Sequence, residues 1–195
     1  ISYQNERYIN ENEIRLLKIV NGEVDYKSQS VQLESAPQLL DGADAGGYSL
    51  QINPGCGSNI LSFNVNHADP EKRSVFGDIR FRQAMSISIN RDEINDVAYY
   101  GLGKVEQFVG ISPAPDFVTE DVKMYMTQYD PDGASALLDE VGLKDTDGDG
   151  FRELPSGAPL AINLDYATQG FGGVEVELIA SCLLYTSDAA DDRVS

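Results

Sequence analysis

The sequence has few of the side chains on which most catalytic and metal sites depend. It contains one histidine and two cysteines among 195 residues. Cys56 and Cys182 belong to no spaced cluster, so we expect free thiols, with a single disulfide as the alternative to them and no zinc site. No Gly-x-Ser-x-Gly segment or comparable nucleophile context accompanies His67, so a histidine-dependent triad is not indicated. We expect His67 to lie in a surface loop.

Basic residues are also scarce. Lys and Arg number 14 against 32 Asp and Glu, which gives a formal net charge of −18 at pH 7. This charge repels phosphate backbones and anionic lipid surfaces, so we expect no nucleic acid as a partner. No apolar run approaches the ~20 residues that a membrane span needs. The hydrophobic fraction of 42% is nevertheless typical of a globular protein and predicts a packed core.

Five segments carry the capping residues and the apolar spacing of helices. In the first, which runs from Asn10 to Gly22, Asn10 is the predicted N-cap, and Ile14 and Leu17 begin the predicted buried stripe. In the fourth, Asp130 stands before a proline, a residue favoured at the first helical position. The predicted helices span 10–22, 78–89, 90–101, 130–142 and 174–184, and their apolar stripes include Phe81, Ala84, Met85, Ile89, Val97, Ala134, Leu138, Leu178 and Cys182.

Two segments alternate apolar and polar residues with the period of a β-strand. Residues 61–66 place Leu61, Phe63 and Val65 on one face, and residues 159–166 show the same alternation. Strands that are separated by helices, with connections rich in turn residues, predict an α/β fold.

The stretch from Asp145 to Gly150 alternates carboxylates with small residues. Alternate Asp side chains followed by glycine can place oxygens around Ca²⁺. An EF-hand, however, requires a bidentate Glu at position twelve of its loop, and that position is Ser156 here. We therefore favour a turn rich in Asp and Gly, and expect no metal and no cofactor. The alternative function is a calcium-stabilised extracellular interaction module built on Asp145, Asp147 and Asp149.

Several longer motifs follow one another in a characteristic order. LLKIVNGEVD occupies residues 16–25, and the more specific FGDIRFRQAMSISINR occupies residues 76–91. YGLG follows at 100–103, and YDPDGASALLDEVGL at 129–143. Together these motifs resemble extracellular solute-binding proteins of family 5, the oligopeptide and dipeptide type that serves ABC transporters. The resemblance covers about residues 10–181.

The resemblance implies a two-lobed, type II periplasmic-binding-protein-like fold, of which this chain is an incomplete part. Residues 1–60 are then the return portion of lobe one with the crossing segment, and residues 61–181 begin lobe two. Family members close around a peptide or another small solute and present it to an ABC permease. Residues 182–195 do not resemble the family, and we hypothesise that this tail is the in-frame translation of a sequencing adapter.

The resemblance further implies a monomeric binding protein that is periplasmic or tethered to the cell surface and has no catalytic residues. Acidic pairs in so acidic a chain do not by themselves indicate the third possibility, a secreted hydrolase. For ligand contacts we predict Asn59 and Asn64, whose amides donate and accept hydrogen bonds near the lobe crossing. We add Tyr100, which offers a ring with a polar tip. The alternative roles are turn capping for each asparagine and packing for the tyrosine.

Overall fold

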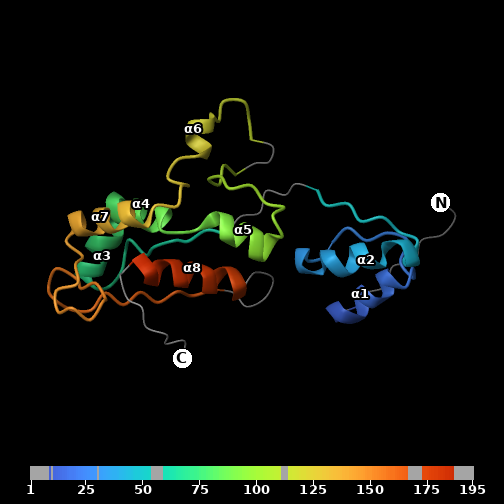
Figure 1. The fold of residues 1–195 in the computed structure, drawn as a ribbon, viewed down its shortest axis with the longest axis horizontal. Helices are drawn as coiled ribbons and strands as arrows, with labels where there is room; N and C mark the ends of the chain where they lie inside the picture. The colour runs from blue at the N-terminus through green and yellow to red at the C-terminus, as the bar shows by residue number, and fades with distance from the viewer. Residues whose placement is uncertain are drawn as a thin grey trace. The chain divides into compact units, whose positions relative to one another are not determined.

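The computed structural model describes residue 9 and residues 11–29, 31–53, 59–110, 114–166 and 173–186. The chain divides into two compact units, Ile1–Pro54 and Gly55–Ser195. None of the helices in these described ranges is long and apolar enough to cross a membrane. The first unit contains α1 (Asn12–Val20), the short 3₁₀ helix η1 (Leu33–Ser35) and α2 (Ala36–Gly46) (Figure 1). The second contains α3 (Pro70–Gly77), α4 (Ile79–Ile87), α5 (Arg91–Tyr99), α6 (Glu120–Lys123), α7 (Pro131–Val141) and α8 (Gly173–Thr186).

Helices α1 and α2 approach each other closely because α2 carries a glycine where they meet. A Cβ atom on Gly42 would lie 2.8 Å from Cγ1 of Val20, which is closer than packed side chains come. The buried apolar residues of the two helices are Ile19 in α1 and Ala36 and Leu39 in α2. The φ of Gly22, 71°, confirms the left-handed end that the sequence predicts for α1.

The predicted buried stripe of α1 is wrong. Ile14 and Leu17 are 45% and 53% exposed, whereas Ile19 is the buried residue of the helix and Val20 is the side chain that meets Gly42 of α2. The predicted cap, Asn10, lies outside the described residues. The residue that precedes the first turn is Glu11, and its side chain makes no capping hydrogen bond.

The two central helices of the second unit begin at predicted caps. The Asp78 carboxylate accepts a hydrogen bond from the N–H of Arg80 at 2.9 Å and starts α4. The Asp130 carboxylate accepts one from the N–H of Gly133, also at 2.9 Å, and starts α7. Such caps satisfy first-turn amides that have no partner inside the helix. Helix α7 ends, as predicted, at Gly142, whose φ is 90°.

The core of the second unit is built where α4 packs on α7. Phe81 and Ala134 have no exposed surface, and Leu138 is 2% exposed, so the predicted apolar stripes are confirmed for both helices. The ring of Phe81 also lies 5.0 Å from that of Phe63 and 5.6 Å from that of Phe76, centroid to centroid. These are the distances at which aromatic rings attract each other. Residues ahead of α3 are thereby held against the core.

The two predicted strands do not form. Throughout the described ranges the only β pairing consists of isolated bridges, both of which involve Glu153. Residues 61–66 end in a turn, and Val65 is 46% exposed. Residues 159–166 are bridged only at their first member. The physical reason is that alternation specifies the two faces of a segment, whereas a ladder also needs a partner strand.

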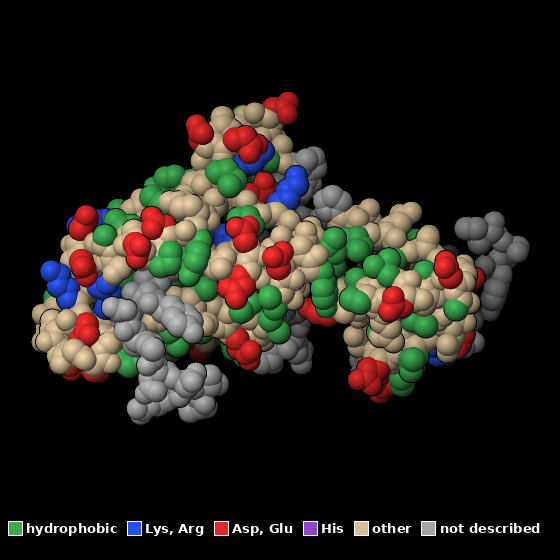
Figure 2. Space-filling view, viewed as in Figure 1, with side chains coloured by type: hydrophobic (Ala, Val, Ile, Leu, Met, Phe, Trp, Pro, Cys, Tyr) green, Lys and Arg blue, Asp and Glu red, His purple; other side chains and the backbone are tan. Residues whose placement is uncertain are grey.

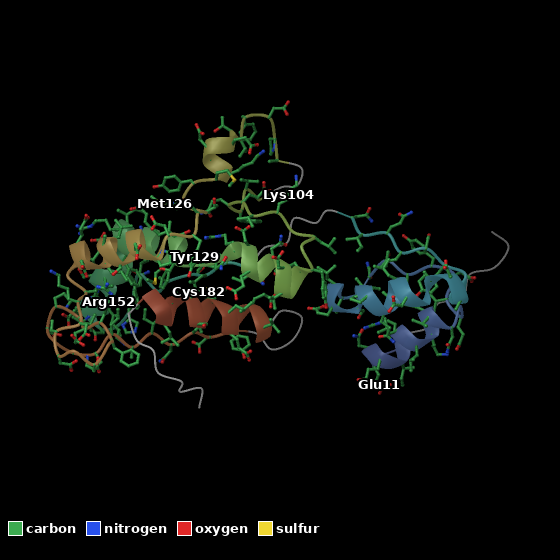
Figure 3. All side chains as sticks on the ribbon, viewed as in Figure 1. Glu11, Lys104, Met126, Tyr129, Arg152 and Cys182 are labelled. Atoms are coloured by element: carbon green, nitrogen blue, oxygen red, sulfur yellow. The ribbon has the colours of Figure 1, made fainter. Side chains whose placement is uncertain are left out.

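A buried arginine in the segment that follows α7 forms hydrogen bonds with that helix. Arg152 is 8% exposed, and Figure 3 shows it beside the loops that follow α7. Its guanidinium donates to the Asp139 carboxylate and to the Ser135 hydroxyl, each at 2.5 Å, and to the carbonyl of Leu143. The planar fork of arginine suits several acceptors at once. No pattern in the sequence singles this residue out.

Candidate ligand-binding site

Helix α5 positions two of the three predicted ligand residues. It begins at Asn90, whose side chain accepts from the N–H of Glu93 at 3.2 Å and donates to the Glu93 carboxylate at 3.1 Å. The predicted cap is confirmed, but the return bond of a capping box would come from the backbone N–H of Asn90, and here it comes from the side-chain amide. The helix ends in two left-handed residues, Tyr100 with φ 54° and Gly101 with φ 70°. The predicted apolar stripe of α5 is wrong, because Val97 is 52% exposed.

Asn59 connects the end of α5 with the start of α8. Its Nδ2 donates to the hydroxyl of Tyr99 at 3.0 Å and to the carboxylate of Glu175 at 3.5 Å. Glu175 stands in the first turn of α8, where a negative charge is favoured, and is 6% exposed. Asn59 itself is exposed. We call Asn59, Tyr99, Tyr100 and Glu175 the α5–α8 polar cluster. It combines a buried carboxylate with amide and phenol groups that reach the surface.

Tyr100 holds an unusual backbone conformation in this cluster. A left-handed residue with a side chain costs about 1–2 kcal/mol relative to the right-handed conformation. Such residues concentrate at functional sites. The Tyr100 side chain is 47% exposed, so its ring is available to a ligand.

Asn64 lies in a separate turn. Its Oδ1 accepts from the N–H of Asn66 at 3.1 Å, and its carbonyl accepts from the N–H of His67 at 3.0 Å. Within the described part of the chain, no hydrogen bond links Asn64 to Asn59 or Tyr100. The structure therefore brings Asn59 to Tyr99, the residue before Tyr100, and gives Asn64 the contacts of a turn. A ligand contact for each of the three stays a prediction.

Two members of the cluster, Tyr99 and Glu175, are not among the site residues predicted from the sequence. The signal for Glu175 was present: it stands three and seven positions before Leu178 and Cys182, on the face of the predicted helix that these residues identify as buried. A carboxylate on a buried helical face needs a partner, and Asn59 is one. Tyr99 carries no comparable signal, because only the fold brings it to Asn59.

The three arginines of the motif at residues 76–91 form hydrogen bonds that stabilise the local structure. Arg80 pairs with Asp78 at 2.7 Å, and its side-chain hydrogen bond lowers the pKa of the Asp78 carboxyl. Arg82 donates to a backbone carbonyl of α3 at 2.8 Å. Arg91 donates to the carbonyl of Ser86 at 2.7 Å, and burial lowers the pKa of its guanidinium.

The stretch from Asp145 to Gly150 forms the turn that we favour. Backbone N–H groups donate to Asp145, Asp147 and Asp149, and Gly148 takes the left-handed φ of 82°. These three carboxylates and that of Glu153 can each place one oxygen within 4.8 Å of the others. That spacing is also compatible with a Ca²⁺ ion, which takes oxygens at about 2.3–2.6 Å. In the structure the oxygens act as hydrogen-bond acceptors of the turn.

The histidine and the described cysteine make contacts that stabilise the local structure. His67 lies in the loop before α3, where its Nδ1 accepts from the N–H of Asp69 at 3.1 Å and its ring packs edge-on against Phe76. Cys182 is buried and forms no disulfide within the described residues. Cys56 lies outside the described residues.

Comparison with known proteins places this arrangement in a family. The chain is 30% identical over 167 residues to the periplasmic alpha-galactoside-binding protein of Rhizobium meliloti (strain 1021), covering 82% of this chain and 20% of that protein. It is 34% identical over 96 residues to the dipeptide-binding protein of Escherichia coli (strain K12), covering 49% of this chain and 16% of that protein. The chain thus spans about a fifth or less of the length of these relatives.

A solved structure agrees in fold. The mannohexaose-bound periplasmic oligopeptide-binding protein of an oligopeptide ABC transporter from Thermotoga maritima superposes with a TM-score of 0.63 at 26% identity, over 92% of this chain and 33% of that one. The chain therefore has the fold of part of an α/β, type II periplasmic binding protein, although the regular elements within its described residues are helices, with no strand longer than a bridge. The family described as "Bacterial extracellular solute-binding proteins, family 5 Middle" matches residues 5–182. The chain belongs to the bacterial extracellular solute-binding proteins of family 5.

Proposed function

We propose that this chain is part of a binding protein that captures peptides or related small solutes for an ABC importer. The observation that carries the proposal is the family match, which extends over residues 5–182. The names of the dipeptide-binding relative and the oligopeptide-binding structure support a peptide ligand. Capture of this kind needs no bond making, so the proposal includes no catalytic residue.

The mechanism that we propose is a population shift. Ligand contacts made by two lobes favour the closed state over the open one, and the closed state then presents its surface to the permease. In this proposal residues 1–60 are the return portion of lobe one with the crossing segment, and residues 61–181 begin lobe two. The protein acts as a monomer in the periplasm or tethered to the cell surface, and residues 182–195 take no part.

The α5–α8 polar cluster supplies the chemistry for one side of the ligand. The amide of Asn59 offers a donor and an acceptor to the main chain of a peptide, and the ring of Tyr100 offers an apolar face with a hydroxyl. The buried carboxylate of Glu175 orients Asn59 through their 3.5 Å contact. Asn64 is the third proposed contact. Peptide binders of this kind hold the main chain directly and leave varied side chains to adaptable polar groups and water.

An oligosaccharide is the second candidate ligand. It is favoured by the alpha-galactoside-binding relative and by the mannohexaose in the oligopeptide-binding structure. Amide and phenol groups can bind sugar hydroxyls as well as peptide groups. The chemistry of the cluster therefore does not distinguish a peptide ligand from an oligosaccharide ligand, and a titration with both is needed.

The test is isothermal titration calorimetry on the full-length protein that contains this chain. We expect binding to a panel of dipeptides to pentapeptides, and Asn59→Ala should weaken it about tenfold, since a hydrogen bond contributes about 1 kcal/mol and often more where its loss leaves a partner unpaired. Asn163→Ala, at an exposed position outside the cluster, is the control and should bind as the wild type does.

Two results would contradict the proposal. If the protein binds mannooligosaccharides or galactosides and no peptide, its ligand is an oligosaccharide and the peptide proposal is wrong. Equal affinity of the wild type and Asn59→Ala for every bound peptide would remove the polar cluster from the site.

A further inference from the structure

The carboxylate of Glu175 has fewer partners than the other buried charges of the molecule. Three charged residues are buried in the described ranges: Arg152, Glu153 and Glu175. Arg152 donates to a carboxylate, a hydroxyl and a carbonyl, and Glu153 accepts from the N–H and the hydroxyl of Thr146 at 2.6 and 2.7 Å. Within the same ranges Glu175 accepts one hydrogen bond, at 3.5 Å from Asn59. A buried charge is costly unless it is well paired, so this carboxylate needs a further partner.

The described residues supply no cation for this carboxylate, since none of the ion pairs among them includes Glu175. Helix α5, which contacts α8, carries Asp92, Glu93 and Asp96, and red acidic side chains gather over α5 on the face that Figure 2 shows. The one basic residue of α5, Arg91, donates instead to a carbonyl and a hydroxyl of α4. This side of the unit is therefore negative, and a positive group is attracted to it.

Two oxygen atoms of the α5–α8 polar cluster remain open to a ligand. Nδ2 of Asn59 donates to the hydroxyl of Tyr99 and to Oε1 of Glu175. Oδ1 of Asn59 and Oε2 of Glu175 accept no hydrogen bond from the described residues. Among those residues the one enclosed side-chain atom without a hydrogen-bond partner is Nε of Arg152, so Oε2 of Glu175 reaches the surface. The cluster thus presents a carboxylate oxygen and an amide oxygen to its ligand.

An ammonium group has the chemistry that this arrangement lacks. It is a compact cation with three N–H donors and no acceptor, which suits a site whose open atoms are acceptors and whose charge is unpaired. Hydrogen bonds between two charged groups are shorter and stronger than the 3.5 Å contact that Asn59 makes. Once an ammonium group binds Glu175, the N–H of Asn59 in that contact becomes free to donate to the main chain of a peptide.

We propose that Glu175 binds the ammonium group of the ligand, so that the α5–α8 polar cluster selects peptides with a free amino group over neutral solutes. This inference rests on the proposed function, because it concerns the ligand of the same site. The amide and phenol groups do not distinguish the two candidate ligand classes, whereas a carboxylate does, because galactosides and mannooligosaccharides carry no ammonium group. A peptide N-terminus and a lysine side chain share this chemistry, and the test separates them.

The test is isothermal titration calorimetry on the full-length protein that contains this chain. The probes are alanine dipeptides to pentapeptides, each with a free and with an acetylated N-terminus. Acetylation removes the charge and should raise Kd at least about tenfold, because truncating one partner of a buried charge pair costs that much or more. A third set, acetylated and with one lysine, shows the source of the group: restored binding assigns it to the lysine side chain, and continued loss assigns it to the N-terminus.

Glu175→Gln keeps the shape of the side chain and removes its charge. It should weaken binding of the free peptides by a similar factor, and acetylation should then have little further effect, because the two changes remove the same interaction. A Glu175 that only supported the fold would weaken free and acetylated peptides alike. Glu177→Gln is the matched control, since it makes the same charge change in the same helix at an exposed position, and it should bind as the wild type does.

Three outcomes would overturn the inference. Equal effects of acetylation on the wild type and on Glu175→Gln would remove Glu175 from the contact and leave peptide capture in place. Equal affinities of the wild type for free and acetylated peptides would do the same, and this comparison needs no variant, so it holds even if Glu175→Gln folds poorly. Binding of no peptide at all would contradict the proposed function together with the inference.

Discussion

The two helix pairs of this molecule are matched in length and differ in how they are held. Helices α1 and α2 have 9 and 11 residues, as have α4 and α7. Aspartate side chains cap both α4 and α7, whereas neither α1 nor α2 has a side-chain cap. The α4–α7 pair buries a phenylalanine completely, and the α1–α2 pair meets through a glycine. Helix pairs of equal length are thus stabilised by different interactions: caps and a buried ring in one pair, and a close glycine contact in the other.

The largest effect is expected where the α4–α7 pair is densest. Phe81→Ala should lower the free energy of unfolding of the second unit by about 3–5 kcal/mol, because it removes a fully buried ring and leaves a cavity. Urea denaturation of the chain measures this change. Ile79→Ala on the same helix, at a side chain that is 55% exposed, is the control and should cost much less. Similar losses in the two variants would show that α4 does not form the core.

A smaller effect, about 1 kcal/mol, is expected for Gly42→Ala in the α1–α2 pair. The added Cβ would meet Cγ1 of Val20 at 2.8 Å, and the resulting strain outweighs the better helix propensity of alanine. Gly77→Ala at the end of α3 is the matched control, since its Cβ would meet nothing within 4 Å. The control should be neutral or slightly stabilising. If both substitutions stabilise the chain in thermal denaturation, the glycine contact is not what joins α1 to α2.

This difference also explains which helices can be predicted from sequence. The caps at Asp78, Asn90 and Asp130 act on amides two or three residues away, so their signals are local and the three helices form as expected. Helix α3 begins with the same Asp-Pro signal, at Asp69, yet a polar first turn follows and no apolar stripe marks it. Helix α2 meets its partner through Gly42, and a glycine contact leaves no periodic apolar pattern.

The candidate site also contains some residues that the sequence predicts and others that it does not. Asn59 and Tyr100 can be singled out because amide and phenol groups suit ligand binding in general. Their neighbours Tyr99 and Glu175 are 40 and 116 positions from Asn59 in the chain. Contacts at such separations follow from tertiary packing, which local sequence patterns do not encode. The predicted strands fail for a related reason, since pairing depends on a second segment.

The smallest effect is expected at the cap that distinguishes α4 from the uncapped α1. The side-chain hydrogen bond from Arg80 holds the pKa of the Asp78 carboxyl below its usual 3.8. Because the folded pKa is the lower one, the stabilisation is complete above pH 3.8 and is lost as the pH falls through 3.8 toward the folded value. Asp78→Asn keeps an oxygen acceptor for the cap but cannot ionise, so it should flatten this acid limb of stability, followed by denaturation between pH 2 and pH 7.

Asn90→Ala is the comparison variant, because it removes a cap that does not itself ionise. It should lower stability by about 1 kcal/mol at neutral pH and keep the wild-type acid limb, since Asp78 and Arg80 remain paired. Asp78→Asn should instead differ most from the wild type above pH 3.8 and least in acid, where the wild-type carboxyl is also neutral. An unchanged acid limb in Asp78→Asn would mean that the ion pair with Arg80, at 2.7 Å, contributes nothing in solution. The advantage of α4 over α1 would then rest on apolar burial and on the uncharged part of the cap, the hydrogen bond from the N–H of Arg80.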